Sequence, residues 1–141
     1  MPDENQMRSA VQAYARAWST ADIEGIVSLF AEDGTFEDPI GSNVMRGRAE
    51  IRTYVRGCLE YTRGPVLMEP FGEVRVAAAG HAACAFIATC AKAEKPFRTA
   101  TLDTFAFNAE GLFSKVQAYF GPSSLHPVDW TDSNVPGAQA N

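Results

Sequence analysis

The short stretch Thr35-Phe36-Glu37-Asp38-Pro39 is the one around which the rest of the chain is organised. Side chains alternate along a β-strand, so we expect Phe36 and Asp38 on one face and Thr35 and Glu37 on the other. Pro39 lacks a backbone N–H and therefore ends regular strand pairing. A carboxylate beside an aromatic ring on an apolar face is costly to bury, and such groups are frequent at functional sites. Taken alone, the same residue is also explained as the cap of the turn that follows Pro39.

Apolar residues recur at helical spacing on both sides of this strand. Residues 4–19 and 49–61 are predicted to be amphipathic helices, and Asp22 is a suitable N-cap for a further helix between them. The apolar stripes of the three helices contain, in chain order, Met7, Val11, Tyr14 and Trp18; Ile23, Ile26, Val27 and Phe30; and Ile51, Tyr54, Val55 and Cys58. A tyrosine on such a stripe is usually a core residue whose hydroxyl reaches a polar partner.

After Val66 the period of the apolar residues changes to two, which is typical of strands. Residues 74–78 and 83–91 flank one turn, and residues 97–107 and 112–120 flank another. Asp103 shares a strand face with Thr101, Phe105 and Phe107, so it is a second acid in step with aromatic side chains. An acid at a strand edge would give the same pattern. Three helices followed by a mostly antiparallel sheet predict an α+β fold with a pocket on the concave face of the sheet.

The 141 residues are most simply one domain, with a framework over residues 1–121 and a polar C-terminal tail over 122–141. We expect this tail to be loosely attached or disordered, although Trp130 could anchor it. The net charge of −5 and the lack of a lysine or arginine cluster argue against nucleic acid or an anionic membrane as a partner. The polar N-terminus does not resemble a signal peptide, and no run is apolar enough to span a membrane. Three cysteines without a CxxC pair indicate reduced core residues in a cytoplasmic protein.

Tyr14, Asp38 and Asp103 are thus three polar groups on otherwise apolar faces. Their order and sequence context resemble the Δ5-3-ketosteroid isomerases of the NTF2-like, or SnoaL-like, superfamily, over about Met7 to Gly121. The matching stretches are Val11-Gln12-Ala13-Tyr14, Asp22-Ile23-Glu24-Gly25-Ile26-Val27-Ser28-Leu29-Phe30-Ala31-Glu32-Asp33, Glu37-Asp38-Pro39-Ile40-Gly41-Ser42, Leu102-Asp103-Thr104-Phe105-Ala106-Phe107-Asn108 and Val116-Gln117-Ala118-Tyr119-Phe120-Gly121.

The resemblance implies a cone-shaped NTF2-like fold, a homodimer and a deep apolar cavity that binds a steroid. It implies that Tyr14 and Asp103 donate hydrogen bonds to the oxyanion and that Asp38 is the general base. In that family the base has a nearly normal pKa and the donor acid a strongly raised one. The reaction requires no metal or organic cofactor, and neither His81, expected in a turn, nor His126, expected in the tail, has the context of a metal ligand.

The resemblance also predicts pocket walls and one departure from the family pattern. The expected wall residues, each of which would serve equally as ordinary core, are Phe30, Phe86, Phe105, Val116 and Phe120. In the family a tyrosine on the third helix commonly supports the oxyanion tyrosine, and this chain has Val55 there. Tyr54 is adjacent, but neighbouring helical residues point about 100° apart, so the support of Tyr14 is in question.

Three functions are compatible with these features. The first is a cofactor-free steroid Δ5-isomerase that uses all three polar groups. The second is another NTF2-like enzyme, such as a polyketide cyclase, dehydratase or epoxide hydrolase, acting on a different substrate. The third is a non-catalytic module that binds a hydrophobic ligand in the same cavity, for which the three polar groups would be coincidental.

Overall fold

Three helices form in the segments where apolar periodicity predicted them, and the computed structural model describes residues 1–131 of the chain. Helix α1 (Glu4–Ser19) begins at a capping box, in which Asp3 and Gln6 each accept the other's backbone N–H at 2.8 Å. Helix α2 (Ile23–Val27) begins at Asp22, whose carboxylate accepts the N–H of Gly25 at 2.9 Å. Helix α3 spans Gly47–Thr62.

The sheet has eight strands, and all of its pairings but one are antiparallel. The strands are β1 (Phe30–Glu37), β2 (Val44–Arg46), β3 (Leu67–Pro70), β4 (Arg75–Ala77), β5 (His81–Cys90), β6 (Phe97–Phe107), β7 (Phe113–Tyr119) and β8 (Leu125–His126). The main order is β2-β1-β7-β6-β5-β3, with β4 paired to β5 and β8 to β6. Strands β1 and β7 are parallel.

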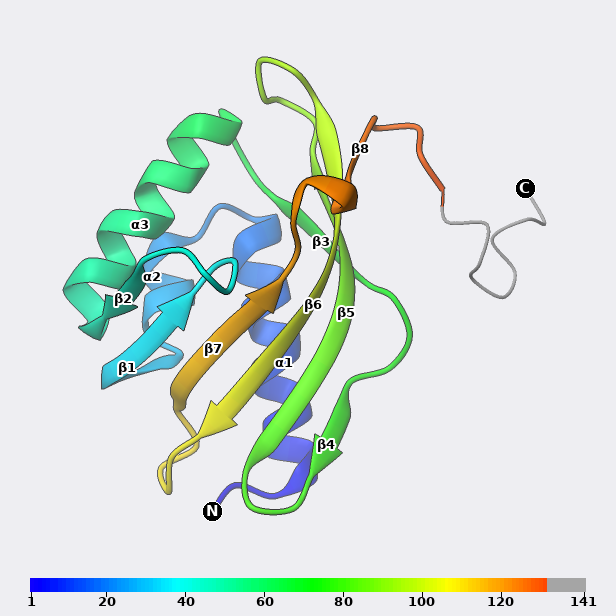
Figure 1. The fold of residues 1–141 in the computed structure, drawn as a ribbon. Helices are drawn as coiled ribbons and strands as arrows, with labels where there is room; N and C mark the ends of the chain where they lie inside the picture. The colour runs from blue at the N-terminus through cyan, green and yellow to red at the C-terminus, as the bar shows by residue number, and fades with distance from the viewer. Residues whose placement is uncertain (132–141) are drawn as a thin grey trace.

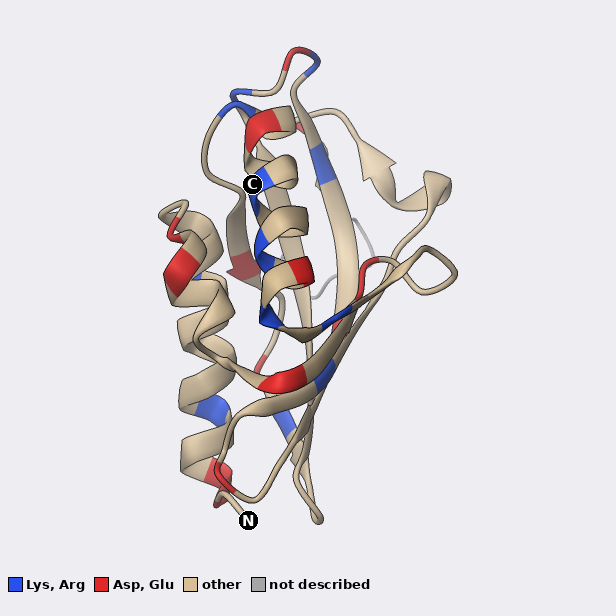
Figure 2. Cartoon of the chain, turned by 90° about the vertical axis from the view of Figure 1, so that its left-hand side faces the viewer, with Lys and Arg blue, Asp and Glu red and all other residues tan. Residues whose placement is uncertain are grey.

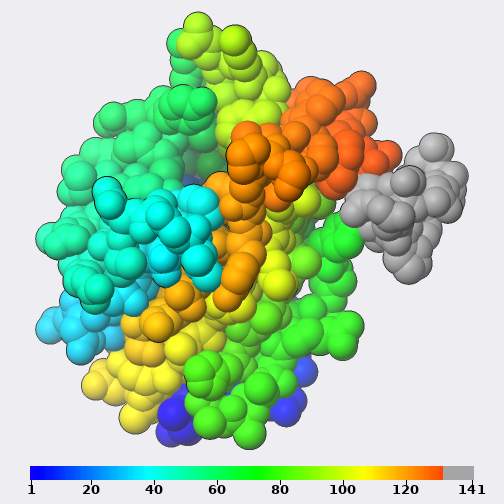
Figure 3. Space-filling model, viewed as in Figure 1, coloured from blue at the N-terminus to red at the C-terminus, as the bar shows by residue number. Residues whose placement is uncertain are grey.

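The helices cover one face of this curved, unclosed sheet, which confirms the predicted α+β architecture (Figure 1). The other face of β5, β6 and β7 forms part of the surface in the space-filling view (Figure 3). Helix α3 carries both arginine and glutamate, so charges of both signs occur along it (Figure 2). One ion pair, Arg52 with Glu24 at 2.6 Å, joins α3 to α2. No helix among residues 1–131 is long and apolar enough to cross a membrane.

Aromatic side chains fill the space between the helices and the sheet. Phe30 and Phe36 of β1, Phe105 of β6 and Phe113 of β7 are each at most 1% exposed. Their rings lie about one ring apart, with centroid distances of 5.1–5.5 Å for Phe30–Phe36, Phe30–Phe113 and Phe105–Phe113. Such tilted and edge-on pairs add to the stabilisation that burial provides. The candidate site lies against this cluster of aromatic side chains.

The sequence prediction was wrong at Phe30 and silent on three short strands, β2, β3 and β8. Phe30 was expected on the stripe of the second helix, but α2 ends at Val27 and Phe30 begins β1, opposite Phe113. Its spacing from Ile26 and Val27 suits a helix, but pairing with β7 overrides that local preference. Strands β2 and β3 have three and four residues, too few for a period of two to be visible.

The segment after β7 is attached to the sheet over its described part. A 3-10 turn (Pro122–Ser124) leads into β8, which pairs with Arg98 and Thr99 of β6. The guanidinium of Arg98 donates to the main-chain oxygen of Trp130 at 2.8 Å, and His126 stacks on the Trp130 ring at 3.8 Å. Residues 132–141, the rest of the expected tail, lie outside the described residues.

Candidate active site

Asp38 directly follows β1, and the side chains around it alternate as expected. Phe36 is fully buried, whereas Glu37 points to the other side, where it accepts from Gln117 and from the N–H of Gly41, both at 3.0 Å. Glu37, and not Asp38, therefore caps the turn after Pro39, and these hydrogen bonds lower the pKa of Glu37. The peptide bond between Asp38 and Pro39 is cis.

The carboxyl group of Asp38 is largely buried, although the residue as a whole is half-buried. Burial disfavours the charged form and raises the pKa of Asp38 to about 6. A hydrogen bond from Tyr54 acts in the opposite direction. The hydroxyl of Tyr54 lies 2.7 Å from Oδ2 of Asp38 and 3.0 Å from its main-chain oxygen. Tyr54 reaches this position from α3, with its ring edge-on against Phe36 at 5.6 Å.

Asp103 lies in the middle of β6, between Cys84 of β5 and Ala118 of β7. It is 2% exposed, and one of its carboxyl oxygens accepts from the Thr101 hydroxyl at 2.7 Å. Burial is the main cause that raises the pKa of Asp103 to about 8. The hydrogen bond from Thr101 opposes the rise and the charge of Asp38 adds to it. Asp103 is therefore mostly a neutral carboxylic acid at pH 7.

Tyr14 projects from α1 into the aromatic cluster and is 2% exposed. Its ring is edge-on to those of Phe105 at 5.2 Å, Phe113 at 6.0 Å and Phe36 at 6.4 Å. Burial raises the pKa of Tyr14 well above its ordinary value, and the charges of Asp103 and Asp38 add to the rise. The charges of both carboxyl groups thus reach the tyrosine, so the three predicted residues lie near one another in the apolar interior. Of the three, only Asp38 lines the cavity described below.

Helix α3 gives the hydroxyl of Tyr14 no hydrogen bond, and the side chain that influences this hydroxyl instead is Trp18 of α1. Val55 is fully buried and offers no hydrogen bond, while the hydroxyl of Tyr54 bonds to Asp38 instead. The indole N–H of Trp18, one helical turn after Tyr14, lowers the pKa of Tyr14 without being placed for a full hydrogen bond. Within residues 1–131 the Trp18 nitrogen is the one fully buried side-chain nitrogen or oxygen atom that lacks a partner.

A cavity of about 610 Å³ opens beside Asp38, between the β1–β2 connection and α3. Its lining comprises Asp38, Ser42, Asn43, Val44, Met45, Ala49, Glu50, Thr53 and Tyr54. None of the five predicted wall residues lines it. Phe30, Phe86, Phe105 and Val116 are 0–1% exposed and belong to the core, and Phe120 is half-buried just after β7.

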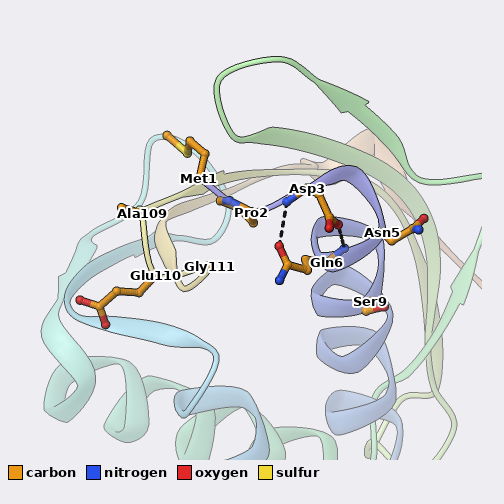
Figure 4. A pocket seen from close by; sticks show the side chains of 9 residues that line it. All are labelled: Met1, Pro2, Asp3, Asn5, Gln6, Ser9, Ala109, Glu110 and Gly111. Atoms are coloured by element: carbon orange, nitrogen blue, oxygen red, sulfur yellow. Dashed lines mark hydrogen bonds between the residues drawn. The ribbon is translucent and has the colours of Figure 1, made fainter.

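Two further hollows lie away from the acid pair. One of about 550 Å³ lies between the N-terminus and the β6–β7 turn, where Asp3 and Gln6 already satisfy each other (Figure 4). The other, of about 460 Å³, lies on the outer face of β5, β6 and β7. In the described part of the chain no three His, Cys, Asp or Glu side chains gather as metal ligands would.

Sequence reasoning identified the three polar groups but missed two residues that hydrogen-bond to them. Thr101 lies two residues before Asp103 on the same strand face, so its contact with Asp103 could have been predicted from the alternation of side chains along a strand. The contact of Tyr54 with Asp38 joins residues 16 positions apart, and no local sequence pattern predicts it. Chemically, an ionised carboxylate and a neutral carboxylic acid near one phenol can remove a proton and stabilise the resulting oxyanion.

The chain matches known proteins over most of its length. The SnoaL-like domain family matches residues 11–116. A steroid Δ-isomerase from Nocardioides simplex is 31% identical over 120 residues, which are 85% of this chain and 94% of that protein. Epoxide hydrolase LasB from Streptomyces lasalocidi is 33% identical over 70 residues, half of this chain and 24% of that protein.

A solved structure shares the fold. It is that of the epoxide hydrolase/cyclase-like enzyme SalBIII, which has a role in pyran ring formation in the polyether salinomycin. The two chains superpose with a TM-score of 0.79 at 25% identity, over 90% of this chain and 99% of the other. The similarity therefore extends to a steroid Δ-isomerase, to an epoxide hydrolase and to an epoxide hydrolase/cyclase-like enzyme.

Proposed function

Because the chain belongs to the family of SnoaL-like domains, in the NTF2-like fold, we propose that it is a steroid Δ5-isomerase. The observation that carries the proposal is the separation of two carboxyl pKa values, about 6 for Asp38 and about 8 for Asp103, beside one buried tyrosine. A pair of titratable groups whose surroundings separate their pKa values can divide the roles of base and acid at neutral pH. The steroid Δ-isomerase relative supports the same choice of reaction.

The reaction would proceed by moving one proton within the substrate. In a 3-oxo-Δ5-steroid, ionised Asp38 removes a proton from the carbon between the ketone and the alkene, and the electron pair moves onto the ketone oxygen. The dienolate then takes the same proton from Asp38 two carbons further along, which leaves a conjugated 3-oxo-Δ4-steroid. Tyr14 and neutral Asp103 donate hydrogen bonds to the dienolate oxygen, where charge develops. These steps need no cofactor.

Ultraviolet absorbance of the conjugated enone tests the proposal directly. We expect absorbance to rise when the purified protein is given a 3-oxo-Δ5-steroid. Asp38→Asn should slow the reaction by about 10²–10⁴-fold, the usual contribution of a general base. Its thermal stability should stay at or above that of the wild type, because the amide oxygen can still accept from Tyr54 and a buried charge is removed. A folded protein that binds the steroid without any change in absorbance would contradict the proposal.

Opening of an epoxide is a second candidate, favoured by the similarity to LasB and SalBIII. Neutral Asp103 would protonate the epoxide oxygen while Asp38 takes the proton of an attacking hydroxyl or water. A cyclic ether or diol formed from an epoxy alcohol, with no enone formed from the steroid, would select this reaction. Steroid binding that Asp38→Asn leaves unchanged, without turnover of either substrate, would select a non-catalytic binding module.

A further inference from the structure

The hydroxyl of Tyr54 faces two acceptor oxygens that belong to one residue. Oδ2 of Asp38 is 2.7 Å away and the main-chain oxygen of Asp38 is 3.0 Å away. A phenol has one proton, so it can donate to only one of the two at a time. Hydrogen bonds to a charged acceptor are shorter and stronger than those between neutral groups. When Asp38 is ionised, the proton is therefore directed to its carboxylate.

The charge of Asp38 changes during the proposed reaction, and with it the balance between these acceptors. Once the carboxyl group has taken the substrate's proton, it is neutral and must turn toward the second carbon. A half-buried hydroxyl left without an acceptor is costly. The main-chain oxygen stays in place when the side chain turns, so it offers Tyr54 a second partner at almost the same distance.

We propose that Tyr54 is a positioning residue that holds ionised Asp38 in its resting orientation and transfers its hydrogen bond to the Asp38 main-chain oxygen when the carboxyl group turns. The inference rests on the proposed isomerase reaction. It explains why α3 presents a tyrosine to the base while the adjacent Val55 is buried without a polar contact. The supporting hydroxyl of α3 serves the base in this chain, and not the oxyanion tyrosine.

The titratable groups around Asp38 come from three elements. Tyr54 and Cys58 belong to α3, Tyr14 to α1 and Asp103 to β6, and the pKa of each of the four is raised in part by the charge of Asp38. Among them only Tyr54 donates a hydrogen bond to Asp38 within the described residues. A change confined to Tyr54 therefore probes that bond.

The experiment compares Tyr54→Phe with Tyr61→Phe, the same chemical change on the same helix. Tyr61 is 74% exposed, so its substitution controls for loss of a hydroxyl far from the base. The pKa of Asp38 is measured without substrate, from the carboxyl carbon resonance of labelled protein across pH. We expect Tyr54→Phe to raise that pKa because the charged form loses a donor, and Tyr61→Phe to leave it unchanged. An unchanged pKa in Tyr54→Phe would overturn the holding role, whatever reaction the protein catalyses.

Kinetics tests whether the hydrogen bond of Tyr54 follows the carboxyl group through the reaction or locks it in its resting orientation. The pH-independent kcat, obtained by fitting the whole pH profile, should fall by about tenfold in Tyr54→Phe because the carboxylate is less well oriented. If Tyr54 only anchored the carboxylate, its removal would let the carboxyl group of Asp38 turn more easily and kcat would rise. A higher kcat in Tyr54→Phe would therefore contradict the transfer of the hydrogen bond to the main-chain oxygen. A wild type without isomerase activity but with the expected shift in the Asp38 pKa would refute the proposed function and leave the holding contact standing.

Discussion

Asp38 and Asp103 are both buried carboxyl groups, and the difference between them lies in single neighbouring residues. Asp38 accepts from Tyr54 and its residue is half-buried, whereas Asp103 is 2% exposed and accepts from Thr101. Burial raises both pKa values, and the charge of Asp38 adds to the rise at Asp103, so that the values are about 8 for Asp103 and about 6 for Asp38. Between these two values the pair carries one charge, located on Asp38, which is the protonation state that the proposed reaction requires.

A bell-shaped pH profile follows from this arrangement. Activity needs Asp38 ionised and Asp103 protonated, so kcat/KM should rise through about pH 6 and fall through about pH 8. In Asp103→Asn the side chain keeps a donor that does not ionise, so the limb near pH 8 should disappear while the limb near pH 6 remains. Initial rates of enone formation across pH check both limbs. A basic limb that persists in Asp103→Asn would show that another group titrates there.

The pH dependence of the free energy of unfolding tests the raised pKa of Asp103 independently of activity. The folded-state pKa of Asp103 is raised above the unfolded value of about 4, so the folded form binds more protons between these two values. The contribution of Asp103 to the free energy of unfolding should therefore fall as pH rises from about 4 to about 8. Asp103→Asn should lose less stability than the wild type over that range, as measured by denaturant melts at each pH.

At the scale of single elements, helix α1 sets the environment of Tyr14. Residues four apart lie one above the other on a helix, so Trp18 is placed beside Tyr14, with ring centroids 6.3 Å apart. The N–H of Trp18 makes no full hydrogen bond, but it opposes part of the rise that burial causes in the pKa of Tyr14, which favours donation by the phenol. Helix α1 thereby places a polar group beside the hydroxyl of Tyr14, whereas Val55 of α3 has none to offer.

Trp18→Phe removes this N–H and keeps an aromatic ring, and we expect kcat to fall by about two- to threefold, because an N–H that makes no full hydrogen bond contributes at the low end of the range for one. Measured again in a Tyr14→Phe background, the same substitution should have little further effect on kcat, because Trp18 acts through the tyrosine hydroxyl. Equal losses in the two backgrounds would mean that Trp18 contributes by packing alone.

The elements also show which parts of the structure local sequence determines. The alternation of Phe36, Glu37 and Asp38 was predictable because the side-chain period of a strand is fixed at two. Strand β6 was predicted with its exact bounds, since eleven residues make that period plain. The contact between Tyr54 and Asp38 was not predictable, because it depends on how α3 lies against β1. Phe30 was misplaced because its spacing satisfies a helix and only the pairing with Phe113 decides against it.

At the scale of the whole molecule, the helices cover one face of the sheet and leave apolar side chains on the other. Leu102 of β6 and Tyr119 of β7 lie directly opposite each other there and are 44% and 50% exposed. Ala85 of β5 is the neighbour of Leu102 on its other side. Contiguous apolar surface of this kind is typical of protein–protein contacts. We propose that a second copy of the chain covers this face, as expected for a homodimer.

A charge placed in the middle of such an interface would be buried without a partner, so Leu102→Asp should convert a dimer into a monomer. Sedimentation equilibrium at micromolar concentration measures the mass directly. Lys115→Asp is a suitable control, because Lys115 is already charged and exposed on the same face of β7, beside the outer hollow. A wild type that sediments with the mass of one chain would refute the dimer. The acid pair lies on the opposite side of the sheet, so the monomeric variant should keep the Asp38 and Asp103 limbs of the pH profile even if its rate changes.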